Sequence, residues 1–169
     1  MLIPLKIHKK MKSKKGINSK KTINRKVGTI HYKLCTDKRV IVNVMFYFYE
    51  ENSKKLSLKT IPMIVDTGAN VTLLNIKFAE KIGFKLNKRR TPQEEIETAG
   101  TKTEIAYKYI VPEIMLDDNG SPVVFVQNLE ILVSEIRVIP EEFGGILGLD
   151  FFEDKKICLD LLNGTLDVT

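Results

Sequence analysis

The sequence predicts a mainly-β fold, a barrel or a sandwich, with one or two short helices. Short runs rich in Val, Ile, Thr, Tyr and Phe alternate with turn residues along the 169-residue chain, as in strands joined by tight connections. The chain has no internal repeat and no regular strand–helix alternation that would build a parallel sheet. Its 43% hydrophobic and 28% charged residues and mean hydropathy of −0.09 are typical of one globular domain with its own core.

The first 28 residues form a separate basic segment. They contain 10 of the 27 Lys and Arg residues and no Asp or Glu, without helical or strand periodicity. We therefore expect a flexible arm over 1–28 and one folded domain over 29–169. The remaining 17 basic residues accompany all 21 acidic ones, so the domain is mildly acidic although the chain carries +6.

Two strands are expected first, at 30–34 and 40–49, around a polar turn at 36–38. A solvated connection is expected over 50–59. Ile61–Val65 is short and almost entirely apolar, which is typical of a strand buried on both faces.

A short helix is predicted over 76–82, where Ile76, Ala79 and Ile82 recur at helical spacing and Gly83 follows as a stop signal. A single helical turn is expected at 151–154. Further strands, which include hairpins around Ala-Gly and Asn-Gly turns, are expected at 93–98, 102–109, 110–116, 123–133, 157–161 and 165–168.

Asp66 is the candidate for chemistry because it directly follows the apolar strand. A carboxylate delivered near the interior is costly unless it is hydrogen-bonded or shares a charge. Gly68 allows a sharp turn that brings backbone N–H groups towards the carboxylate, Thr67 offers a bracing hydroxyl, and Ala69 keeps the floor small and apolar. Asp-Thr-Gly alone can also be a strand-ending turn, so both interpretations stay open on this tripeptide.

Several other kinds of site are excluded. The chain has no Gly-rich phosphate loop, no G-x-S-x-G elbow and no His-paired Ser or Cys. Cys35, Cys158, His8 and His31 form no ligand cluster, so we expect no metal and no cofactor. The start lacks the order of a signal peptide, and the longest apolar run, 40–49, is far shorter than the roughly 20 residues of a membrane helix. We therefore expect a cytoplasmic protein.

Two motifs give the sequence a resemblance to a known family. Residues 64–74 are IVDTGANVTLL, and residues 145–152 are GILGLDFF. In this order and spacing they resemble the retropepsin-like aspartic proteases, the single-domain relatives of retroviral and retrotransposon proteases. The resemblance implies that Asp66 is catalytic, that Thr67, Gly68 and Ala69 complete its loop, and that three residues of the second motif support the loop from beneath: Ile146, Leu147 and Gly148.

The resemblance also implies a flap, a hairpin over 93–109 whose tip is Thr98, Ala99 and Gly100. An extended peptide would lie between the flap and Asp66, bound through its main chain. Val71, Ile96, Ile105 and Ile146 are candidates for apolar walls around the scissile bond, although each taken alone is more typical of core.

Peptide hydrolysis by carboxylates needs two of them, one to take a proton from water and one to polarise the amide carbonyl. The chain has one Asp-Thr-Gly; Asp150 and Asp160 lack this turn, and we expect Asp150 to begin the short helix. We therefore expect a homodimer that places the two copies of Asp66 side by side, with each Thr67 gripping the opposite loop. The chain end at 165–168 is a candidate interface strand.

The sequence thus predicts an aspartic endopeptidase that acts on a peptide or protein substrate as a homodimer. One alternative is a catalytically silent module of the same fold that binds peptides or dimerises. Another is a contact of the basic arm with nucleic acid or an anionic surface, although the arm has no aromatic residue for stacking on bases.

Overall fold

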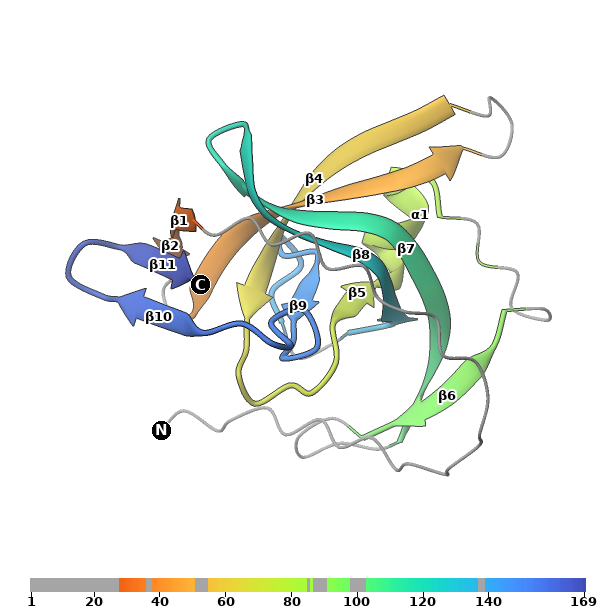
Figure 1. The fold of residues 1–169 in the computed structure, drawn as a ribbon. Coiled ribbons are helices and arrows are strands. Elements are labelled where there is room, and N and C mark those ends of the chain that lie inside the picture. The colour runs from red at the N-terminus through yellow and green to blue at the C-terminus, as the bar shows by residue number, and fades with distance from the viewer. Residues whose placement is uncertain are drawn as a thin grey trace.

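Figure 1 shows the fold in a computed structural model, which describes residues 28–35, 38–50, 55–84, 86, 91–97, 103–136 and 139–169. The predicted arm, apart from Gly28, lies outside the described residues. The predicted fold class is confirmed, because the described residues form eleven strands and one helix. In chain order the elements are β1 (Gly28–His31), β2 (Lys33–Leu34), β3 (Val40–Glu50), β4 (Lys55–Val65), β5 (Leu73–Asn75), α1 (Ile76–Ile82), β6 (Gln93–Ile96), β7 (Glu104–Asp118), β8 (Ser121–Ser134), β9 (Gly145–Leu147), β10 (Ile157–Asp160) and β11 (Thr165–Val168).

The larger sheet has eight strands in the order β2-β3-β4-β9-β5-β8-β7-β6. Because β3 also pairs with β7, the sheet curls back on itself as a partly closed barrel. A smaller sheet of three strands, in the order β1-β11-β10, lies beside the barrel in Figure 1. In the part of the chain described, no helix is long and apolar enough to cross a membrane.

Two apolar clusters form the core on the two sides of β4. Ile61 and Met63 belong to the larger cluster inside the barrel, whereas Ile64 belongs to a smaller cluster with Ala69 and Ile146. Ile61, Met63 and Ile64 are at most 2% exposed. The end of β4 is therefore buried on both faces, as its apolar sequence predicts, and it leads directly into the Asp66 loop.

Local sequence signals place the helix α1 correctly. It spans Ile76–Ile82 as predicted, with Ala79 and Ile82 buried. The side chain of Asn75 accepts a hydrogen bond from the Lys77 N–H at 3.0 Å and caps the first turn. Gly83 ends the helix at φ 102°, a conformation that glycine adopts without steric penalty.

Other predicted elements differ from the structure. The expected connection over 50–59 contains the first half of β4, which pairs with β3 as far as Glu50. The first half of β4 is largely exposed, so burial gave no signal for it; Leu56 and Leu58 are 52% and 43% exposed. The expected strand 30–34 divides into β1 and β2, which belong to different sheets.

The expected strand 110–116 is part of the longer β7, and the expected helical turn at 151–154 is a series of turns. Asp154, in the last of these turns, has a φ of 63°, a left-handed conformation that does not continue a helix.

Candidate active site

The loop between β4 and β5 begins with Asp66. Its N–H donates to the carbonyl of Leu147 at 3.1 Å, and its Oδ1 accepts from the Gly68 N–H at 2.8 Å. The Ala69 N–H donates to the Asp66 carbonyl at 3.1 Å, which closes a tight turn. Asp66 is half-buried, Thr67 is exposed and Ala69 is fully buried, so the turn runs from the surface back into the core within a few residues.

Both ends of this loop rest on β9, the strand of the second motif. Ile64 and Val65 pair in parallel with Ile146 and Leu147, while Leu73 pairs with Ile146 from the other side. Because β9 lies between β4 and β5, it positions the residues before and after the loop together. Ile146 and Leu147 thus lie where the resemblance implies a support for the loop.

The third predicted support, Gly148, lies against the far end of the loop. A Cβ atom at Gly148 would stand 2.5 Å from the backbone carbonyl group of Val71 and 2.9 Å from the Thr72 nitrogen. The Gly148 N–H donates to the Thr72 hydroxyl at 3.1 Å. The approach of the two backbones therefore requires glycine.

Asp150 holds Thr72 from this second segment, a role the sequence did not reveal. Its Oδ2 accepts from the Thr72 N–H at 2.9 Å, and its Oδ1 accepts from the Thr72 hydroxyl at 2.7 Å. Its Oδ1 also accepts from the Phe151 N–H at 2.8 Å, the local cap that the sequence suggested, although turns follow it instead of a helix. No local pattern marks the Thr72 contact, because the two residues are 78 positions apart.

The strands predicted to carry the flap pair as expected. β6 pairs with β7 from Gln93 opposite Tyr107 to Ile96 opposite Glu104. The predicted tip, Thr98, Ala99 and Gly100, lies outside the described residues. The hairpin strands are therefore in place beside the loop, and the role of the tip stays a prediction.

A charge cluster ties these strands to β8. The Lys108 ammonium lies 2.9 Å from Glu94 Oε2 and 3.3 Å from Glu130 Oε1. The hydrogen bond with Glu94, together with the charge of Glu130, raises the pKa of Lys108 above its usual value against the opposing effect of burial. One cation on β7 thus bridges carboxylates on both neighbouring strands.

The candidate wall residues divide into two groups. Ile96 and Ile146 are 3% and 1% exposed and belong to the smaller core cluster, with Val71 packed against it. Ile105 is 56% exposed at the start of β7. Ile96 and Ile146 therefore act as core, whereas Ile105 is available to a ligand.

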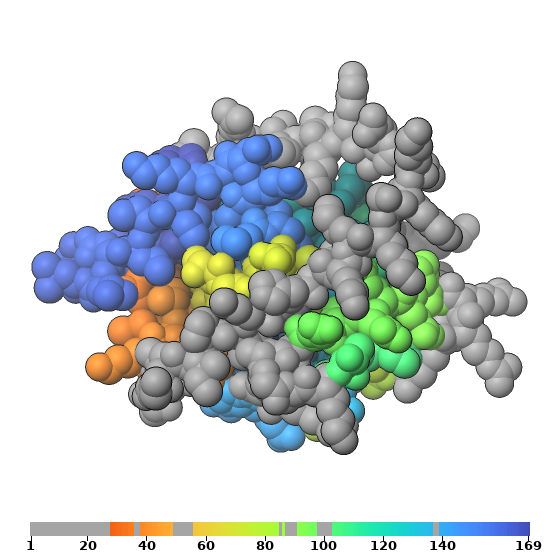
Figure 2. All heavy atoms as spheres, turned by 90° about the horizontal axis from the view of Figure 1, so that it is seen from below, coloured from red at the N-terminus to blue at the C-terminus, as the bar shows by residue number. Residues whose placement is uncertain are grey.

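The loop opens on one face of the molecule. In Figure 2 the yellow segment around the Asp66 loop lies between the blue C-terminal segments and the green flap strands. Figure 1 shows the same order, with the loop projecting from the lower side of the barrel. One face thus presents the Asp66 loop between the C-terminal segments and β6.

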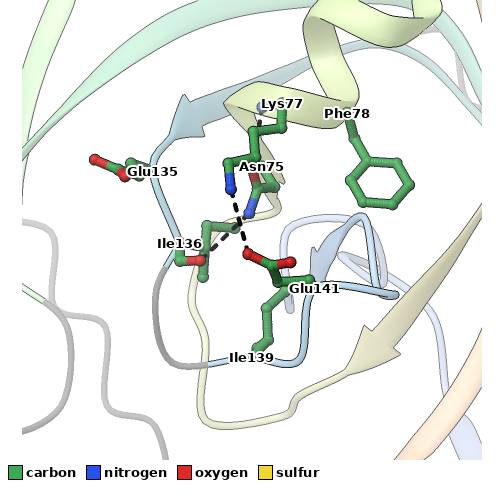
Figure 3. Close-up of a pocket in the computed structure, with 7 residues that line it drawn as sticks. All are labelled: Asn75, Lys77, Phe78, Glu135, Ile136, Ile139 and Glu141. Carbon is green, nitrogen blue, oxygen red and sulfur yellow. Dashed lines mark hydrogen bonds and ion pairs between the residues drawn. The ribbon is translucent and has the colours of Figure 1, made fainter.

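A separate cavity of about 260 Å³ lies at the start of α1 (Figure 3). Lys77 and Glu141 form an ion pair across its mouth at 3.3 Å, and Asn75 Nδ2 donates to the Ile136 carbonyl at 3.3 Å. None of the predicted site residues lines it. Among the described residues, no group of three or more His, Cys, Asp and Glu side chains is placed to hold a metal ion.

Comparisons with known proteins agree with this geometry. The family model described as "Aspartyl protease" matches residues 54–151, which include the first motif and all but the last residue of the second. The chain belongs to this aspartyl protease family. No curated protein sequence matches it significantly.

Among solved structures the fold is similar to that of a retropepsin-like aspartic protease from Rickettsia conorii. The TM-score is 0.55 at 19% identity, over 84% of this chain and 90% of that one. At this identity the likeness concerns the fold, and the fold is retropepsin-like.

Proposed function

We propose that the protein is an aspartic endopeptidase whose site is completed by a second copy of the chain. The observation that carries this proposal is the single carboxylate at the head of the β4–β5 loop, half-buried and held by the Gly68 N–H. Family membership supports a protease-type function. The mechanism needs two carboxylates, and the β4–β5 loop itself contributes one, Asp66.

The other aspartates near the two motifs have structural partners. Both carboxylate oxygens of Asp150 accept hydrogen bonds from Thr72. Asp160 accepts from the backbone N–H groups of Leu162 and Asn163 in the last hairpin. A second copy related by a twofold axis supplies the missing group, because the same loop then faces itself.

In this dimer the two Asp66 carboxylates lie within hydrogen-bond distance and share one proton, since two like charges that close do not both persist. The ionised carboxylate takes a proton from a water molecule as the water attacks the peptide carbonyl carbon, and the protonated carboxyl donates to the carbonyl oxygen. Thr67, exposed beside the carboxylate, would contact the opposite loop.

Replacing Asp66 with Asn tests this proposal. We expect Asp66→Asn to lower the cleavage of a diverse peptide mixture by about a thousandfold between about pH 4 and pH 7, because the base is lost. Sedimentation should show the same dimer, since the change keeps the shape of the side chain. Asp154→Asn is the matched control, because Asp154 is exposed in the turns that follow the second motif.

The catalytically silent alternative gives a different result. If the wild-type protein binds peptides or dimerises but cleaves none of them, and Asp66→Asn behaves identically, the proposed activity is wrong. Cleavage that survives in purified Asp66→Asn contradicts the assigned role of Asp66.

A further inference from the structure

The strands β6 and β7 turn one face towards the β4–β5 loop. In a ladder, residues directly opposite each other place their side chains on the same face. Glu94 pairs with Ala106 and Ile96 pairs with Glu104, so these four side chains share a face. Ile96 and Ala106 are 3% and 0% exposed and belong to the smaller core cluster, which also contains Ala69 of the loop.

The opposite face of the same two strands is exposed. Glu95 pairs with Ile105, and both side chains are exposed. Figure 2 shows the green segments of these strands on the same side of the molecule as the yellow loop. The two strands therefore carry carboxylates on both faces, one face towards the loop and one towards solvent.

The two glutamates on the face towards the loop differ in their charge partners. Glu94 lies 2.9 Å from the Lys108 ammonium, so its charge is balanced. Glu104, the first residue of β7, is half-buried, and within the part of the chain that the structure describes its carboxylate has no ion-pair partner. A partly buried carboxylate is stabilised when a cation binds to it, because the cation replaces hydration lost on burial.

The surroundings of Glu104 fit a long cationic side chain. Opposite residues in a ladder have Cβ atoms about 5 Å apart, so Glu104 stands beside the apolar Ile96. The methylene stem of lysine or arginine packs on apolar side chains while its charged head pairs with a carboxylate. The segment is also acidic as a whole, since residues 93–109 contain four glutamates and two lysines.

We infer that Glu104 selects substrates with a lysine or arginine side chain near the scissile bond. This inference rests on the proposed enzyme and names its substrate class. A peptide bound between the predicted flap and the loop excludes water from the carboxylate, which makes the ion pair stronger than an exposed one. A twofold axis repeats the site, so the preference should appear on both sides of the scissile bond.

A mixture of short random peptides locates this preference. Mass spectrometry of the cleavage products should show lysine or arginine enriched at one position on each side of the cut bond. One cleaved peptide is then compared with a copy that has norleucine in place of the lysine, which keeps the stem without the charge. The wild type should cleave the lysine peptide with a kcat/KM about tenfold higher.

Substitutions on the two faces assign the preference to Glu104. Glu104→Gln should bring the ratio of kcat/KM between the lysine and norleucine peptides to about one, mainly by raising KM for lysine, because the ion pair is formed already in the bound substrate. Glu104→Lys should reverse the preference towards glutamate at that position. Glu95→Gln, the same change on the opposite face, should leave the ratio unchanged. Circular dichroism checks that each variant folds.

Failure of this inference is distinguishable from failure of the proposed activity. Asp66→Asn keeps the shape of the site and leaves peptides intact, so the random peptides that it retains report the preference without cleavage. Basic peptides retained by Asp66→Asn, but not after Glu104→Gln is added, would support the inference even if the wild type cleaves nothing.

Two results would overturn the inference and leave the proposed activity standing. One is cleavage with no preference for lysine or arginine, and the other is a basic preference that survives Glu104→Gln. Absence of both cleavage and peptide binding would overturn the inference together with the proposed activity.

Discussion

The support beneath the Asp66 loop and the strands predicted to carry a flap, β6 and β7, contain different kinds of side-chain interaction. The support, which we call the loop cradle, consists of Thr72, Gly148 and Asp150. Thr72 is completely buried. Hydrogen bonds of 2.7 to 3.1 Å join Thr72 to the other two residues. Besides their backbone pairing, the predicted flap strands are joined to each other and to β8 by ion pairs of Lys108 with Glu94 and Glu130, whose side chains are 29%, 15% and 46% exposed.

This difference fits the roles that we propose for the two regions, a fixed catalytic loop and a flap. Buried hydrogen bonds are costly to break because no water replaces them, so the cradle keeps the Asp66 loop in one geometry. Ion pairs in contact with solvent are screened by salt and contribute little to stability. The proposed hydrolysis needs a carboxylate held in one place, and the predicted flap would have to open for a peptide to enter.

The largest loss of stability is expected when a methyl group is added at Gly148 in the loop cradle. Gly148→Ala places a methyl group against the backbone of Val71 and Thr72, which cannot move without shifting the loop. We expect a loss of about 3 kcal/mol in the free energy of unfolding and loss of peptide cleavage.

Urea denaturation measures the effect of Gly148→Ala, and Gly120→Ala is its control. A Cβ at Gly120 meets nothing within 4 Å, and only its φ of 87° opposes the change, so about 1 kcal/mol should be lost. Equal losses in the two variants would contradict the close approach at Gly148.

A smaller loss of stability is expected when hydrogen bonds within the loop cradle are removed. Thr72→Val keeps the shape of the side chain but leaves the buried Gly148 N–H without its acceptor and removes one donor to Asp150. We expect a loss of about 2 kcal/mol in the free energy of unfolding, with a further loss of cleavage in the variant that stays folded.

The control for Thr72→Val is Thr60→Val, at an exposed position of β4, which should change stability by less than about 0.5 kcal/mol. If both valine variants retain wild-type stability and cleavage, the cradle does not position the loop.

The smallest effect is expected at the flap strands. Lys108→Met should lower the free energy of unfolding by no more than about 1 kcal/mol, because the ion pairs are partly exposed. The raised pKa of Lys108 fixes the sign of the pH dependence: its contribution is present below about pH 10.5 and is lost as pH rises past its value in the folded protein.

Denaturation at about pH 8 and about pH 11, with and without about 1 M NaCl, measures this contribution. The difference between wild type and Lys108→Met should shrink in high salt and at the higher pH. Lys77→Met is the control, since its partner Glu141 is 92% exposed and no measurable loss is expected. A Lys108 contribution that salt does not reduce would remove the contrast with the cradle.

The parts of the fold that could be predicted from sequence depend on neighbouring residues. The helix Ile76–Ile82 follows from apolar spacing and a glycine stop, and the last hairpin from its Asn-Gly turn. The buried end of β4 follows from its apolar run. The first half of β4 was missed because its side chains stay in water, where a strand needs no apolar pattern.

The candidate site also has a part that neighbouring residues predict and a part that they do not. The Asp66 turn is local: Gly68 and Ala69 hydrogen-bond within it. The contact between Asp150 and Thr72 spans 78 positions and leaves no periodic trace, so Asp150 was expected only as a local cap.

By itself, the sequence determined that this is a mainly-β protein with one carboxylate placed after a buried strand, because strand periodicity, turn chemistry and a short motif are properties of adjacent residues. Only the tertiary structure decided that β9 lies between β4 and β5, that Asp150 binds Thr72, and that β11 pairs with both β1 and β10. These outcomes depend on which distant backbones pair. Every residue except proline offers the same backbone N–H and C=O groups, so neighbouring residues do not specify which distant strands will pair.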